Sequence, residues 1–160
     1  MIQATTETGI TIYIQTEDNR INTSVASTQI RHLMKFTNDM DGSVHYAYGA
    51  AETIYNRYTY IPMHYNVNPD IYTGKTKLFP AGYWKYEAYE VSWTGTVTVS
   101  SGYAPATEDD VLAPAAANKG IVQGLVTKGK MYLAEKDGTE QVQYTQRQEP
   151  SGTNYIYYGQ

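Results

Sequence analysis

The most regular pattern of hydrophobic and polar positions lies between residues 82 and 93, where the two types alternate residue by residue. A period of two is typical of a β-strand, because successive side chains point to opposite faces. One face carries Trp84, Tyr86 and Ala88, and its low polar content predicts that it faces a core. The other face mixes charged and aromatic residues and is expected to be partly solvated or covered by another protein: Tyr83, Lys85, Glu87, Tyr89 and Val91.

The residues before this strand predict a tight corner, because Pro80 fixes φ and Gly82 adds backbone freedom. Asp41-Gly42 predicts a hairpin turn for the same conformational reason, and Asp137-Gly138 predicts a second turn. Further segments with alternation or with many β-branched and aromatic residues are expected to be strands. They are residues 8–16, 29–37, 44–48, 57–66, 71–79, 94–101, 121–135 and 153–160. Pro62 predicts an edge strand or a bulge.

This pattern predicts an all-β sandwich or barrel of nine or ten short strands. The length of 160 residues fits one domain over 1–160. Residues 102–120 are rich in Ala, Pro and acidic residues, and we expect them to form a flexible surface connection. Pro150-Ser151-Gly152 separates an aromatic segment at 153–160, which is expected to dock as a terminal strand on a sheet edge of this chain or of a neighbouring subunit. Residues 1–8 are suited to the same role.

Composition narrows the possible functions. The net charge is −4 and the pI is near 5.3, which argues against nucleic acid and anionic membranes as partners. The chain has no cysteine, so disulfides, thiolate catalysis and cysteine-ligated metals are excluded. No apolar stretch approaches the roughly 20 residues of a membrane span, and the first residues do not resemble a secretory signal.

Candidate catalytic and ligand-binding motifs are incomplete. Residues 124–130 and 74–76 each match part of a phosphate-binding loop, but the first has Met131 where a hydroxyl is needed and the second has Pro69 in place of the leading glycine. The three histidines lack metal-ligand spacing, and they are expected to be partly exposed sheet residues: His32, His45 and His64. Glu87 and Glu90 fall on opposite faces of one strand and cannot flank one glycosidic bond. We therefore expect no catalytic residue, no metal and no cofactor.

Aromatic residues are the feature that these exclusions leave. Seventeen tyrosines stand against five leucines, and one small core can hardly absorb them all with their hydroxyls satisfied. Some are expected to be core residues, and the remainder are expected to form a partner surface. The candidate interface residues are Tyr83, Tyr89, Trp93, Tyr155, Tyr157 and Tyr158.

The run from Leu78 to Glu90 resembles a pattern in small virion proteins of tailed bacteriophages. In that pattern a Leu and a turn glycine, here Gly82, precede Tyr-x-Tyr-x-x-Tyr-Glu. A later strand at 124–133 and the 36–42 hairpin are similar to the same pattern. The resemblance implies an immunoglobulin-like antiparallel β-sandwich with extended terminal strands and no enzymatic activity. Such sandwiches often have a corner tyrosine beside the turn glycine. Trp84 occupies that place, and indole can only donate a hydrogen bond.

The expected function is therefore that of a non-catalytic structural component of a bacteriophage particle. It would be an auxiliary or minor capsid protein or a head–tail protein, located in the virion. Its expected partners are other virion proteins, namely capsid, portal or tail proteins, and further copies of itself. The alternative function is a carbohydrate-binding or adhesion β-sandwich that presents exposed aromatic residues to glycans.

Overall fold

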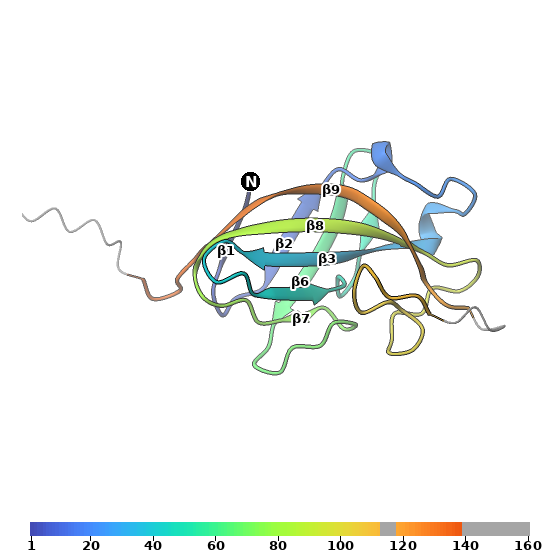
Figure 1. The fold of residues 1–160 in the computed structure, drawn as a ribbon. Coiled ribbons are helices and arrows are strands. Elements are labelled where there is room, and N and C mark those ends of the chain that lie inside the picture. The colour runs from blue at the N-terminus through green and yellow to red at the C-terminus, as the bar shows by residue number, and fades with distance from the viewer. Residues whose placement is uncertain (113–117, 139–160) are drawn as a thin grey trace, which may run out of the picture.

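The computed structural model describes residues 1–112 and 118–138, and these residues form two β-sheets packed face to face (Figure 1). The larger sheet has the strand order β1-β9-β8-β3-β4. Its strands are β1 Ile2–Thr5, β9 Ile121–Ala134, β8 Gly82–Ser92, β3 Ile30–Asn38 and β4 Val44–Ala47. The smaller sheet has the order β2-β6-β5, and β7 pairs with the end of β6. Its strands are β2 Ile10–Ile14, β6 Thr59–Tyr65, β5 Thr53–Ile54 and β7 Lys75–Thr76.

The all-β prediction is confirmed for the described residues, in which the helical structure consists of two short 3₁₀ turns, Glu17–Asn19 and Ser27–Gln29. The prediction of purely antiparallel sheets is wrong, because β1 pairs with β9 in parallel and β7 pairs with β6 in parallel. Neither pair is joined by a hairpin, so nothing requires the strands to run in opposite directions. The strand at Ile2–Thr5 also shows that the N-terminal segment pairs with an edge of its own chain.

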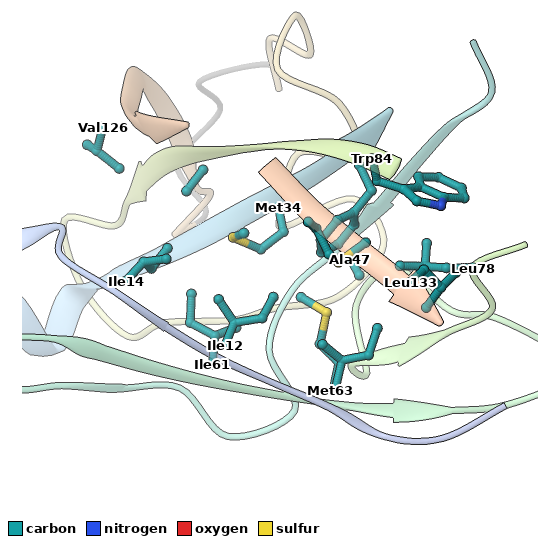
Figure 2. Packing of buried hydrophobic residues seen from close by; sticks show 14 residues of the cluster. Ile12, Ile14, Met34, Ala47, Ile61, Met63, Leu78, Trp84, Val126 and Leu133 are labelled. Carbon is teal, nitrogen blue, oxygen red and sulfur yellow. The ribbon is translucent and has the colours of Figure 1, made fainter. Parts of the chain in front are cut away.

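The main core lies between the two sheets, and Figure 2 shows side chains of both sheets meeting there. The smaller sheet contributes alternate residues of β2 and β6, of which Ile12 and Ile61 are fully buried. From the larger sheet, Trp84 and Ala88 are fully buried on β8, and Tyr86 packs against the cluster while partly exposed. The predicted core face of β8 is therefore confirmed, whereas Val91 on the opposite face is fully buried by the chain itself, contrary to the expectation of solvent or another protein there.

The corner before β8 is fixed by Trp84. Its indole Nε1 donates to the backbone carbonyl of Pro80 at 3.1 Å. The buried ring and this bond hold the chain between Pro80 and Gly82 against the core.

The predicted Asp-Gly hairpin joins β3 to β4. Gly42 has φ of 73°, and the Asn38 side-chain oxygen accepts from the backbone N–H groups of Met40 and Asp41. The turn chemistry read from the sequence is confirmed here.

Pro62 lies at a gap in the smaller sheet, between the places where β5 and β7 pair with β6. Its carbonyl points away from β2 and accepts from Ala50 N–H at 2.8 Å. In a strand, the backbone N and C=O of one residue point to the same side. The nitrogen of Pro62 therefore also points into this gap, and its lack of an N–H costs no hydrogen bond to β2.

Two predicted strands are wrong in extent. Within 71–79 only Lys75–Thr76 is a strand, because Asp70 and Gly74, the latter with φ of 73°, turn the chain tightly. Residues 94–101 contain no strand, since β8 ends at Ser92 and the chain folds back over the outer face of the larger sheet.

The returning segment covers one end of that outer face and forms a second hydrophobic cluster with β3 and β8. Ala104 is buried, and the Tyr48 hydroxyl donates to the Pro105 carbonyl at 2.7 Å. Tyr103 also accepts from Gly120 N–H at 2.8 Å. The described part of residues 102–120, which we expected to be a flexible surface connection, is thus packed against the sheet by specific contacts.

Replacing Trp84 with alanine should lower the free energy of unfolding by about 3–5 kcal/mol, because it opens a cavity in the core and removes the bond to Pro80. Urea denaturation measures this loss. Tyr83→Ala is the matched control at the neighbouring exposed position and should cost less than about 1 kcal/mol. Equal losses in the two variants would contradict the assignment of faces on β8.

Candidate interaction surfaces

Four tyrosines lie together on the outer face of the smaller sheet. We call Tyr13, Tyr55, Tyr58 and Tyr60 the tyrosine platform. The ring centroids of Tyr55 and Tyr58 are 4.8 Å apart, those of Tyr13 and Tyr58 are 5.7 Å apart, and those of Tyr13 and Tyr60 are 5.5 Å apart. Tyr13 is 61% exposed. These distances are typical of contacting aromatic rings, so the four side chains form one continuous apolar surface.

Strand alternation places the platform on the outer face. Tyr13 lies between Ile12 and Ile14, which point into the core, and it pairs across the strands with Tyr60. A short turn brings Tyr55 beside Tyr58, with Tyr55 N–H donating to the Tyr58 carbonyl at 2.9 Å. The platform is therefore built on rigid, hydrogen-bonded backbone.

Charged groups border one end of the platform. Gln15 is the first residue after β2, and its side-chain amide donates to Asp18 at 2.8 Å. Thr16 and Thr59 share a buried hydroxyl–hydroxyl bond of 2.5 Å, which fixes the turn containing Glu17 and Asp18 against β6. The exposed Arg57 lies in the turn between Tyr55 and Tyr58.

A second exposed surface lies on the outer face of the larger sheet. We call Tyr83, Tyr132, Lys85, Lys128 and Lys130 the lysine–tyrosine band. Tyr83 is 56% exposed, and its ring centroid is 5.1 Å from that of Tyr132. Lys85 is paired directly with Lys130 on the neighbouring strand.

Two lysines side by side repel each other, and Asp39 offsets this repulsion. Its carboxylate accepts a hydrogen bond from Lys130 and lies 3.7 Å from Lys85 Nζ. The bond from Lys130 is the main cause of the lowered pKa of Asp39. Glu87 lies opposite Lys128 on the neighbouring strand. Three lysines against these two carboxylates still leave the surface with an excess of positive charge, although the whole chain is acidic.

The hollows of the described residues do not suggest an enclosed ligand site. A cavity of about 150 Å³ beside Leu78 and Lys136 is smaller than the roughly 300 Å³ at which small-molecule pockets begin. A larger hollow of about 540 Å³ is a shallow depression lined by Lys85, Glu87 and Lys128 and their neighbours on β8 and β9. The lysine–tyrosine band is thus a shallow surface and not an enclosed pocket.

A polar network fixes the segment that covers the other end of the larger sheet. Lys35 on β3 bonds Glu108, and the Tyr46 hydroxyl donates to the other Glu108 oxygen at 2.5 Å. Burial tends to raise the pKa of Glu108, but the bonds from Lys35 and Tyr46 outweigh it and lower the pKa. The same bond raises the pKa of Lys35, and burial followed by the bond to Glu108 raises the pKa of Tyr46 to about 12.

The candidate interface residues separate into four groups. Tyr83 is exposed and belongs to the band. Tyr89 is half-buried, and its hydroxyl donates to Glu87 at 3.3 Å. Trp93 is fully buried in the second hydrophobic cluster, so its prediction as an interface residue is corrected: the chain's own returning segment covers it. The remaining three, Tyr155, Tyr157 and Tyr158, lie outside the described residues.

The sequence alone did not predict the tyrosine platform. Its signal was present, because Tyr58 and Tyr60 alternate with the buried Thr59 and Ile61. Tyr55 could not be assigned in this way, since it reaches the platform through a turn. The pairing of β2 with β6, which joins Tyr13 to the other tyrosines of the platform, could not be predicted from the sequence.

The ionisable residue buried most deeply on β3 is His32, and its predicted partial exposure is wrong. Its ring Nδ1 lies 2.6 Å from Glu52, whose second oxygen accepts from His32 N–H at 2.9 Å. Both oxygens of Glu52 contact His32 of β3, so this carboxylate fixes the loop before β5 to the larger sheet.

Residues 1–112 and 118–138 contain no cluster of three or more His, Cys, Asp or Glu side chains suited to a metal ion. None of the helical turns in these ranges has the length and hydrophobicity needed to cross a membrane.

Comparison with known proteins adds no relative. No protein-family model, curated protein or solved structure matches this chain. Its function is therefore inferred from its own surfaces.

Acid should weaken the Lys35–Glu108 network. Because the folded-state pKa of Glu108 is lowered, its contribution is present above the ordinary carboxylate value of about 4.5 and is lost as the pH falls through the folded-state pKa. Urea denaturation at neutral and acidic pH should show about 1–2 kcal/mol more acid destabilisation in the wild type than in Glu108→Gln. Identical pH dependence of the two proteins would show that the network contributes nothing.

Proposed function

We propose that this protein is a non-catalytic structural component of a bacteriophage particle, an auxiliary or minor capsid protein or a head–tail protein. It acts through contacts with other virion proteins, such as capsid, portal or tail proteins, and with further copies of itself. The observation that carries the proposal is the tyrosine platform, a continuous and exposed aromatic surface on a rigid sheet. The similarity of residues 78–90 to small virion proteins supplies the biological setting.

The chemistry of the platform supports a protein partner. Tyrosine provides a large, rigid contact area with few rotatable bonds, and it is enriched in the buried centres of protein interfaces. Exposed apolar patches on rigid elements are typical of interaction sites. The shallow shape of the lysine–tyrosine band matches a broad partner better than a small ligand.

We also propose that the two-sheet arrangement is a variant of the immunoglobulin-like sandwich. The buried Trp84, which bonds the corner carbonyl of Pro80, supports this assignment, since the tyrosine corner of such domains performs the same task. The parallel β1–β9 pairing distinguishes this chain from a purely antiparallel sandwich.

The alternative function is carbohydrate binding, and the same platform favours it, because tyrosine rings stack against the apolar faces of sugars. The platform is flanked by Asp18 and Arg57, whose side chains are suited to hydrogen bonds with sugar hydroxyls. The two functions differ in the contact area that they need. A sugar covers a few rings, whereas a stable protein interface takes roughly 800 Å² from each partner.

A glycan array tests these alternatives directly. The wild-type protein should show no saturable binding to any glycan class, because the platform is assigned to a protein partner. Tyr58→Ala serves as the matched negative control, since it removes a central ring at an exposed position. Saturable binding that is lost in Tyr58→Ala would make carbohydrate binding the function.

Particle composition tests the virion assignment itself. Particles purified by density gradient from a culture that expresses this chain should contain it at a fixed ratio to the shell protein, as measured by mass spectrometry.

Deleting residues 154–160, which lie outside the described residues, should leave a domain that unfolds cooperatively but is lost from the particles. This result is expected because the two described sheets form their core from residues 2–134. Full incorporation of the truncated chain would show that the terminal segment is dispensable for docking.

A further inference from the structure

We infer that copies of this chain stack head to tail, with the tyrosine platform of one copy against the lysine–tyrosine band of the next. This inference rests on the proposed structural role and names one partner for it, a second copy of the same chain. It is carried by the position and the chemistry of two surfaces on one rigid sandwich.

The two surfaces lie on opposite sides of the molecule. Tyr13 alternates with Ile12 and Ile14, which point into the core from the smaller sheet. Tyr83 and Tyr132 alternate with buried residues that point into the same core from the larger sheet: Trp84, Met131 and Leu133. The platform and the band therefore face outward in opposite directions. Figure 2 shows the core side chains that lie between the two sheets.

The chemistry of the two surfaces is complementary. The face of a tyrosine ring attracts a lysine ammonium within about 6 Å, and the band presents three exposed lysines to a partner. Lys128 is exposed and lies opposite Glu87 on β8, whose carboxylate also lies 3.8 Å from Lys35 Nζ. Glu17 at the end of the platform is paired with Arg20 at 3.7 Å, and Asp18 is matched by the exposed Arg57, so the ring faces rather than net charge attract the lysines.

The same chemistry disfavours contacts between two identical surfaces. A band facing a second band brings three lysines against three lysines, and like charges in contact are destabilising. A platform facing a second platform leaves the lysines without aromatic partners. The favoured contact is therefore heterologous, and because its two halves lie on opposite sides of the chain, it repeats to form a ring or a filament.

The test uses two double variants of the purified full-length chain. Tyr13→Ser with Tyr58→Ser disables the platform, and Lys85→Glu with Lys130→Glu disables the band. All four positions are exposed, so both proteins are expected to fold, and far-UV circular dichroism checks this. Sedimentation velocity measures self-association between about 1 μM and 1 mM, the range of weak interfaces that assemble on a particle.

The wild type should associate as its concentration rises, and each double variant alone should weaken association at least tenfold. An equimolar mixture of the two variants should form 1:1 dimers and nothing larger, because only the intact platform of one and the intact band of the other can meet. Lys77→Glu with Lys136→Glu is the matched control. It makes the same charge change beside the small cavity at the end of the sandwich and should associate as the wild type does.

Three results would overturn head-to-tail stacking: a wild type that stays monomeric throughout, variants that associate normally, or a mixture that stays monomeric while the wild type associates. These results leave the virion role intact if the chain is still found in purified particles. The virion role fails separately, through absence from particles or through saturable glycan binding.

Discussion

The structure depends on covering both faces of β8. Trp84 and Ala88 are buried between the sheets, whereas Val91 and Trp93 are buried on the opposite face, under the segment that follows the strand. A strand with a charged and aromatic second face would ordinarily be solvated on that side. Here the chain supplies its own cover, but only for the second half of the strand. The first half, with Tyr83 and Lys85, stays exposed, and this difference locates the lysine–tyrosine band.

The charged residues on the outer face of the larger sheet also differ between its covered half and its exposed half. On the covered half, Lys35 meets Glu108 of the covering segment, and the desolvation of both groups is compensated by hydrogen bonds. On the exposed half, Lys85 and Lys130 share the single carboxylate of Asp39, which leaves positive charge directed toward solvent. The covered half is thus compensated within the chain, while the exposed half is suited to an external aromatic or acidic partner.

Local patterns predicted the parts of this fold that local physics decides. Alternation identified Trp84 and Ala88 as core residues, and Asp41-Gly42 identified the hairpin, because both depend on neighbours in sequence. The burial of Trp93 and the tyrosine platform could not be obtained this way. Trp93 is covered by residues that continue past the strand in an irregular path, and Tyr13 joins Tyr60 only because β2 pairs with β6. Long-range pairing decides such features, and a single sequence carries no direct signal for it.

The choice of tyrosine explains how one chain tolerates two exposed aromatic surfaces. Phenylalanine or leucine at these positions would expose wholly apolar area and promote indiscriminate association. A tyrosine hydroxyl keeps a hydrogen bond to water in the free protein, and the ring still gives apolar area when a partner arrives. Because the rings of the platform contact one another and stand on paired strands, little side-chain freedom is left to lose on binding. Surfaces of this kind suit an assembly in which many weak contacts of one type are repeated, since each contact remains reversible until the neighbouring copies fix it.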